Sequence, residues 1–217
     1  MRRRVVVVAG SAAAALLVVG TVTGLALRQP DGTSATKTAP VPPPFTTAES
    51  ACGLRGSDGT QGAVDASWED VAGWALPISA TDGPGMRDPR GAWSCYTRTE
   101  SGAVLAAYVI AMRGGGLADD WQTVVREQTM PGPGQEILLG SVPNFSSVTT
   151  PRGFDVAGYT EDRATVRYRL LVNGGEYACT IDVQWSRDDW RLVLGNDGST
   201  SSGCSREIPA EFTPWGP

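Results

Sequence analysis

The sequence of 217 residues contains no histidine. This absence excludes Ser-His-Asp and Cys-His catalysis, because both mechanisms need an imidazole as the general base. Lysine is nearly absent as well, with Lys37 alone beside 17 arginines. The glycine run at 114–116 therefore lacks the lysine that a phosphate-binding P-loop requires, and we interpret it as the end of a helix.

Cysteine is scarce, and no two cysteines have CxxC spacing. A dithiol redox site would need that spacing, and a zinc site, the alternative, would have to be built without it and without histidine. An even number of cysteines in an exported chain is typical of disulfides. Three connectivities are open. We favour Cys52 with Cys95 and Cys179 with Cys204, because each pair brackets a segment with little capacity to fold by itself.

A long apolar run begins the chain. Arginines at 2–4 precede residues 5–27, which hold no charge, and Arg28 follows. A helix of that length reaches about 34 Å, enough to cross a bilayer core of about 30 Å. The arginines predict a signal anchor with the N-terminus inside and the rest of the chain outside the cytoplasm, after a basic stub at 1–4. A cleaved signal peptide remains the alternative, since Gly-Leu-Ala at 24–26 offers a small-x-small site.

Residues 28–50 are rich in proline and threonine. Such a segment buries too little apolar surface to fold, which predicts a semi-extended stalk. The remainder, 51–217, suits one extracytoplasmic domain. Residues 29–217 hold 14 of the 18 basic residues and all 23 acidic ones, so their formal charge is −9. We therefore expect no direct binding of nucleic acid, which needs a basic surface.

Two helices are predicted in the middle of the chain. After Thr97 or Thr99 as the N-cap, apolar residues recur every three to four positions up to the glycine run. A second helix is predicted near 118–129, and a short helical or irregular piece at 135–141.

From residue 154 onward the apolar residues alternate, which predicts four antiparallel strands. They lie at 154–160, 164–172, 177–185 and 190–194. Asn173 and the two glycines after it predict a hairpin turn, and 71–78 predicts a short edge strand. The expected fold class is α+β, with two to three helices covering a curved antiparallel sheet of about four strands.

Neighbouring carboxylates occur at Asp119/Asp120, Glu161/Asp162 and Asp188/Asp189. Adjacent acids on a helix or in a turn do not face each other, and we interpret them as a helix start and as solvated hairpins. Asp182 lies in mid-strand opposite the apolar face and is interpreted as solvent-facing. We expect no catalytic residue, no metal site and no cofactor.

Three aromatic residues of the predicted strands are candidates for a ligand pocket, and core packing explains them equally well. They are Tyr168, Trp185 and Trp190.

Several short motifs follow one another along the chain. They are Cys-Gly-Leu at 52–54, Leu-Pro-Ile-Ser at 76–79, Gly-Pro at 83–84, Cys-Tyr at 95–96, Thr-Glu-Ser-Gly-Ala-Val at 99–104, Tyr-Thr-Glu-Asp-Arg-Ala-Thr-Val at 159–166, the strand 183–194 with its Asp-Asp-Trp-Arg-Leu-Val, and Pro-Trp-Gly at 214–216. In this order, over about residues 52–217, the sequence resembles a family of single-span actinobacterial proteins found with integrative conjugative elements.

The resemblance implies an exported domain similar to the nuclear-transport-factor-2-like, or cystatin-like, cone. It also implies a membrane-anchored, non-enzymatic accessory or scaffold protein of a conjugative DNA-transfer apparatus, like bitopic type IV secretion assembly factors. The expected partners are other membrane or secretion-apparatus proteins, with self-association as a second option. Two alternatives remain: a small-ligand-binding or enzymatic module of the same fold, and a general structural protein of the cell envelope.

Overall fold

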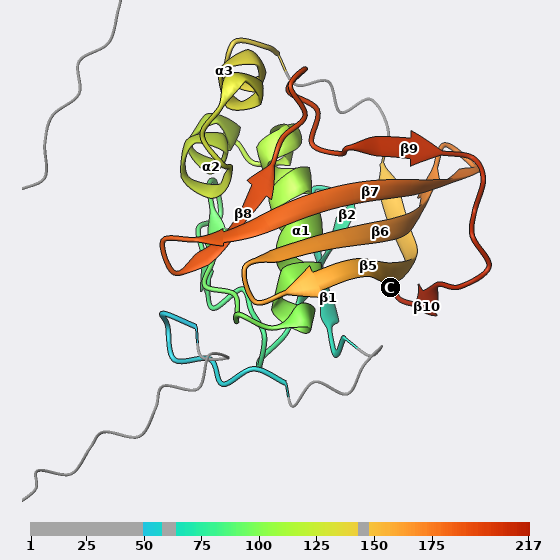
Figure 1. Ribbon diagram of the computed structural model, residues 1–217, viewed down its shortest axis with the longest axis horizontal. Coiled ribbons are helices and arrows are strands. Elements are labelled where there is room, and N and C mark those ends of the chain that lie inside the picture. The colour runs from blue at the N-terminus through green and yellow to red at the C-terminus, as the bar shows by residue number, and fades with distance from the viewer. Residues whose placement is uncertain (1–49, 58–63, 143–147) are drawn as a thin grey trace, which may run out of the picture. The chain divides into compact units, whose positions relative to one another are not determined.

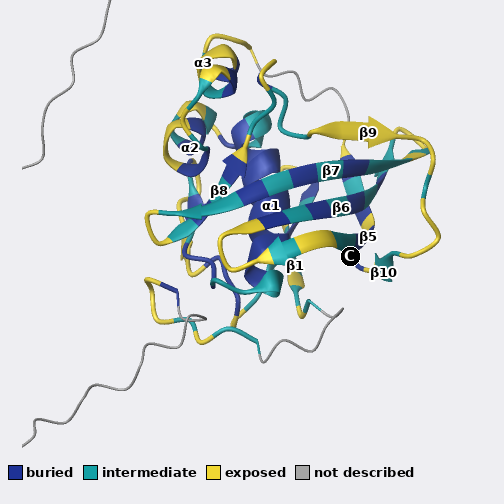
Figure 2. Ribbon diagram, in the orientation of Figure 1, coloured by how far each residue is buried: buried dark blue, intermediate teal, exposed yellow. Residues whose placement is uncertain are grey.

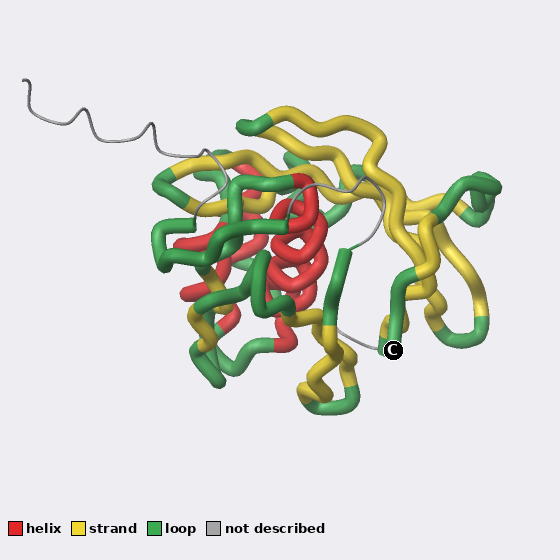
Figure 3. The backbone as a smooth tube through the Cα atoms, turned by 90° about the horizontal axis from the view of Figure 1, so that it is seen from below, coloured by secondary structure: helices red, strands yellow, loops and turns green. Residues whose placement is uncertain are grey.

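An antiparallel sheet formed by the C-terminal part of the chain dominates the computed structural model, which describes residues 50–57, 64–142 and 148–217 (Figure 1). The strand order is β10-β5-β6-β7-β8, and β9 pairs with the other end of β7. The strands are β5 (Thr149–Thr160), β6 (Arg163–Val172), β7 (Gly175–Ser186), β8 (Asp189–Val193), β9 (Gly203–Ser205) and β10 (Thr213–Pro214). Figure 3 shows the main sheet strongly bent.

Alternation of apolar and polar residues accounts for the long strands. In β6 every second side chain from Ala164 to Leu170 is buried, while the arginines and the threonine between them are not. The turn between β6 and β7 places Asn173 at φ 50° and Gly174 at φ 78°. These left-handed conformations match the twist of a two-residue hairpin. The predicted long strands and their hairpin are therefore confirmed.

Helix α1 (Glu100–Met112) packs against one face of the main sheet and also contacts β2 and β4. Thr99 is its N-cap, and the Thr99 hydroxyl accepts a hydrogen bond of 3.0 Å from the backbone N–H of Gly102. Every residue from 102 to 112 is buried (Figure 2), as expected for a helix that is apolar all round. One π-helical turn, η1 (Arg113–Leu117), follows at the glycine run.

Two shorter helices follow. Helix α2 (Trp121–Gln128) begins at the predicted acidic pair, because Asp120 is its N-cap. Helix α3 (Pro133–Leu139) begins two residues before the predicted helical piece. The fixed φ of Pro133 suits the first helical position, so this proline starts a helix rather than only ending the previous one.

The N-terminal part of the domain forms two small hairpins: β1 (Ser67–Val71) with β2 (Trp74–Ile78), and β3 (Met86–Arg87) with β4 (Trp93–Ser94). The short strand predicted at 71–78 is confirmed over 74–78 as β2, but residue 71 ends β1 and residues 72–73 form the turn between the two strands. Ala72 and Gly73 have φ of 52° and 85° and turn the chain back on itself. An alanine in a left-handed turn gives no sequence signal, because alanine seldom adopts this conformation.

The predicted fold class, a cone of about four strands packed by two to three helices, is wrong. The main sheet has six strands, and the described residues hold more strand than helix, with three short α-helices. The added strands β9 and β10 contain glycine, serine, proline and threonine without apolar alternation, so their pairing comes from tertiary contacts that periodicity does not show.

No helix in the described part of the chain is long and apolar enough to cross a membrane. The predicted anchor at 5–27 and nearly all of the predicted stalk lie outside the described residues.

The C-terminal segment is fixed to the core by Trp215, which is 7% exposed. Its ring lies 4.8 Å from Trp68, 5.6 Å from Phe154 and 5.9 Å from Tyr108, measured between ring centroids. These edge-on contacts are the favoured geometry of aromatic pairs. They explain why a segment as short as β10 keeps its place beside β5.

Candidate functional site: the outer face of the sheet

The face of the main sheet that points away from α1 is the candidate functional site, and we call it the outer face. Figure 1 looks onto it, and no helix of the described residues crosses it. Its side chains come from the polar positions of the central strands β6 and β7, because side chains alternate between the two faces of a sheet. They are Arg163, Thr165, Arg167, Arg169, Ala178, Thr180, Asp182 and Gln184.

Charged groups on the outer face are paired with each other. The Arg167 guanidinium donates to the Asp155 carboxylate, and Arg169 Nη2 lies 2.7 Å from a Glu176 carboxylate oxygen. Thr165 donates a hydrogen bond of 2.6 Å to Asp182 on the neighbouring strand. The outer face therefore presents compensated hydrogen-bonding groups rather than a strong charge of one sign.

A groove of about 530 Å³ lies at the β9 end of this face. Its floor is formed by Arg167, Ala178 and Thr180, and one side is the segment 203–209, which we call the wall. The wall includes Glu207, Ile208 and Pro209. A guanidinium, a carboxylate and short apolar side chains together suit a polypeptide segment or a small polar ligand.

A second depression of about 320 Å³ lies at the β8 end. It is lined by Thr165, Asp182 and Val193, among others. The structure therefore places Asp182 on the outer face, as predicted, and adds a hollow beside it. Asp155, paired with Arg167, sits on the same side.

The disulfide Cys179–Cys204 joins β7 to β9 next to the groove. The two cysteines are directly opposite each other in the strand register, with a Cα–Cα distance of 4.1 Å. The other disulfide is Cys52–Cys95, with a Cα–Cα distance of 5.9 Å. This is the pairing that the sequence favours, and two disulfides fit an extracytoplasmic domain.

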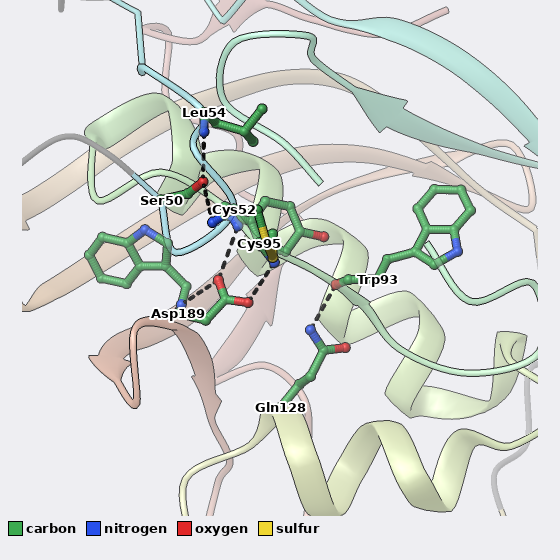
Figure 4. The surroundings of a disulfide bond; sticks show 9 residues. Ser50, Cys52, Leu54, Trp93, Cys95, Gln128 and Asp189 are labelled. Carbon is green, nitrogen blue, oxygen red and sulfur yellow. Dashed lines mark hydrogen bonds between the residues drawn. A yellow bond between two sulfur atoms is a disulfide. The ribbon is translucent and has the colours of Figure 1, made fainter. Parts of the chain in front are cut away.

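The Cys52–Cys95 disulfide is surrounded by a separate polar cluster (Figure 4). The two carboxylate oxygens of Asp189 accept hydrogen bonds of 2.8 Å from the Cys95 N–H and 3.1 Å from the Tyr96 N–H. Burial raises the pKa of Asp189, and the hydrogen bonds from Cys95, Tyr96 and Trp190 offset only part of that effect. The interpretation of this acid as a solvated hairpin residue is wrong.

A buried carboxylate, Asp82, also holds the N-terminal arm. Burial acts to raise the pKa of Asp82, but hydrogen bonds from the Ser57 N–H and from the hydroxyls of Thr97, Thr81 and Thr99 keep it below its usual value. Asp82 thus joins the segment around Ser57 to the start of α1. Asp82 carries no periodic signal, so the sequence did not indicate it.

Arg113 is fully buried. It donates hydrogen bonds to the backbone carbonyls of Gly91, Asp88 and Pro89, and its guanidinium lies 4.8 Å from the Trp93 ring centroid. Burial lowers its pKa. Arg113, at the start of η1, thus stabilises the β3–β4 hairpin. The sequence did not indicate this role, because an arginine beside glycines is usually exposed.

The three candidate pocket residues do not lie on the outer face. Tyr168 and Trp190 are fully buried. Tyr168 donates its hydroxyl proton to the Val104 carbonyl, and the Trp190 N–H donates a hydrogen bond of 2.8 Å to the Thr97 carbonyl. Trp185 is partly buried, with its ring centroid 5.4 Å from that of Trp190. All three pack in or against the core.

Within the described ranges, no three acidic or cysteine side chains gather as metal ligands would. A family model described as a domain of unknown function, DUF8175, matches residues 32–211. Neither a curated protein nor a solved structure matches the chain.

Proposed function

The chain belongs to the DUF8175 family, a domain of unknown function, and we propose that it is a membrane-anchored, non-enzymatic accessory or scaffold protein of a conjugative DNA-transfer apparatus. In this proposal residues 5–27 anchor the chain with its N-terminus inside. The domain works outside the cytoplasm and binds other membrane or secretion-apparatus proteins. The motifs at 52–216 that resemble conjugation-element proteins are the basis for naming this apparatus.

The outer face is the observation that carries the binding role. Its polar groups are held in register by a six-stranded sheet and by pairs such as Thr165 with Asp182. A rigid surface of this kind loses little conformational freedom on binding, which favours association. Non-obligate protein interfaces are about as polar as the rest of a protein surface, so a polar face with two hollows suits a protein partner.

Gene deletion in a donor cell, followed by measurement of transfer frequency, tests the proposal. We expect transfer to fall after deletion and to return with the wild-type chain. The variant Thr180→Arg, which fills the groove, should fail to restore it, whereas Gln122→Arg on the exposed side of α2 should restore it. If Thr180→Arg removes about 1.4 kcal/mol of binding free energy, the complex with the partner becomes tenfold weaker. Unchanged transfer after deletion would contradict the proposal.

The groove also favours a second candidate function, a small-ligand-binding module. Its volume of about 530 Å³ falls within the range of about 300–1,000 Å³ typical of ligand pockets. Under this alternative, Thr180→Arg abolishes binding of a cell-envelope metabolite to the purified domain. A structural role in the envelope, the third candidate, predicts that cell shape or envelope integrity changes after deletion while transfer does not.

A further inference from the structure

We propose that the Cys179–Cys204 disulfide is a reducible cross-link between β7 and β9. An exported protein dithiol reduces it, and its reduction releases the wall of the groove. This inference rests on the proposed function, because it concerns regulation of the same outer face. The test below measures reduction of the disulfide and exchange of backbone amides, and it does not measure partner binding. This inference can therefore fail while the proposed function holds, and the proposed function can fail while this inference holds.

The strand register connects the disulfide to the groove. Cys179 faces Cys204, and the flanking pairs are Ala178 with Ser205 and Thr180 with Gly203. All four flanking residues line the groove. Any movement of β9 away from β7 therefore separates the floor of the groove from its wall.

Few other contacts hold β9 in place. The strand has three residues, and all three are exposed (Figure 2). Beside its register pairs with β7, the neighbouring Ser202 N–H donates a hydrogen bond of 2.9 Å to the Thr180 carbonyl. A strand this short, without a buried side chain, gains little from the hydrophobic effect. Arg206, directly after β9, donates a hydrogen bond of 3.0 Å to the Tyr177 hydroxyl, and its guanidinium lies 5.4 Å from the Tyr177 ring centroid. The disulfide adds a covalent constraint to these exposed contacts.

The other disulfide is supported differently. Cys95 donates from its N–H to Asp189 and accepts at its carbonyl from the Gly85 N–H at 3.0 Å. Breaking Cys52–Cys95 would leave Cys95 fixed by these bonds. A thiolate that approaches it also meets the Asp189 carboxyl, whose oxygen accepts from the Cys95 N–H. A negative group beside a disulfide disfavours attack by a thiolate.

The exchange proceeds in two balanced steps. A thiolate of the dithiol attacks the exposed Cys204 sulfur, which breaks the bond to Cys179 and forms a mixed disulfide. Cys179 leaves as a thiolate and takes up a proton. The second thiol of the dithiol then attacks the mixed disulfide, so Cys204 is released as a thiol and the dithiol becomes a disulfide. Two electrons pass to the protein.

Limiting dithiothreitol, followed by alkylation and peptide mass mapping, tests the selectivity. We expect Cys179 and Cys204 to be alkylated at dithiothreitol concentrations that leave Cys52 and Cys95 protected. Hydrogen–deuterium exchange on the same samples should show loss of protection at 203–205, with β6 unchanged. The double variant Cys179→Ser with Cys204→Ser should reproduce this exchange pattern. The matched variant Cys52→Ser with Cys95→Ser should not.

Two results would overturn the inference. One is alkylation of Cys52 and Cys95 at the same or lower dithiothreitol concentration. The other is unchanged exchange at 203–205 once Cys179 and Cys204 are free thiols. Because the wild-type chain gives both readings, a serine variant that fails to fold does not prevent the test.

Discussion

The carboxyl group of Asp189 accepts a hydrogen bond of 2.8 Å from the backbone N–H of Cys95, 94 residues earlier in the chain. This bond ties the first residue of β8 to the N-terminal arm, beside the Cys52–Cys95 disulfide. The disulfide cross-links the arm to itself, and the partly buried carboxyl group of Asp189 attaches the arm to the sheet.

Replacing this carboxyl should destabilise the domain. In Asp189→Asn the amide group turns a donor toward at least one of the three N–H groups that the carboxylate satisfies, those of Cys95, Tyr96 and Trp190, which leaves a partly buried donor unpaired. We expect the free energy of unfolding to fall by about 1–3 kcal/mol, measured by urea denaturation. The neighbour Asp188 is exposed, and Asp188→Asn should stay within about 0.5 kcal/mol. Equal losses of stability in Asp189→Asn and Asp188→Asn would contradict the structural role of the Asp189 carboxyl.

The contributions of Asp189 and Asp82 to stability should depend on pH with opposite signs. The folded-state pKa of Asp189 is raised, so its contribution is present at low pH and is lost as pH rises through that pKa. The folded-state pKa of Asp82 is lowered, so its contribution is present above the usual value of 3.8 and is lost as pH falls through the lower folded value. We therefore expect the stability difference between wild type and Asp189→Asn to shrink as pH rises.

For Asp82→Asn, the difference from wild type should grow as pH rises. Urea denaturation of both variants and the wild type, at a series of pH values on either side of 3.8, checks both slopes. Slopes of the same sign would show that one of the two environments is wrongly described.

Removal of the hydroxyl group should change the stability of the domain differently at two fully buried tyrosines. Tyr168 donates to the Val104 carbonyl, and Tyr168→Phe should cost about 0.5–1.5 kcal/mol because this hydrogen bond is lost. The Tyr96 hydroxyl has no hydrogen-bond partner among the described residues. Tyr96→Phe should therefore be neutral or stabilising in thermal denaturation. A larger cost at Tyr96 than at Tyr168 would refute this account.

Removal of the Trp215 ring should destabilise the domain more than removal of Trp185. Trp215 is buried among aromatic rings of β1, α1, β5 and β6, and Trp215→Ala should cost about 3–5 kcal/mol. Trp185 is only partly buried, so Trp185→Ala should cost less. Chemical denaturation of the two variants provides the comparison, and the reverse order would mean that the C-terminal segment is not part of the core.

The sequence predicted the parts of the fold that depend on local pattern. Alternation located β6 and β7, because each buries every second side chain. The N-cap Thr99 and the apolar run up to the glycines located α1, although this helix is buried on all sides. It did not predict β9 and β10, which are held by the Cys179–Cys204 disulfide and by Trp215 rather than by their own residues. Nor did it predict β1, because the hairpin at 67–78 turns at an alanine.

The candidate site was less accessible to sequence reasoning. Tyr168 and Trp190 were indistinguishable from pocket residues until their burial was known, and the outer face consists of the polar positions that periodicity marks only as solvated. Asp189 looked like its exposed neighbour Asp188. A contact across 94 residues has no local signature.

The proposed anchor leads to a prediction for the N-terminus. If residues 5–27 form an uncleaved signal anchor, the intact mass of the protein from washed membranes should include them, and alkaline extraction should not release it. A mature protein that starts near Leu27 would show that the segment is a cleaved signal peptide.

Photo-crosslinking from the outer face in donor-cell membranes tests the central claim most directly. A photoreactive amino acid at Thr180, in the groove, should capture membrane or secretion-apparatus proteins of the transfer system, and the same group at Gln122 on α2 should not. Mass spectrometry identifies the captured neighbours. The account predicts discrete crosslinked proteins that are specific to Thr180. Crosslinks that are absent at Thr180, or identical at the two positions, would contradict it.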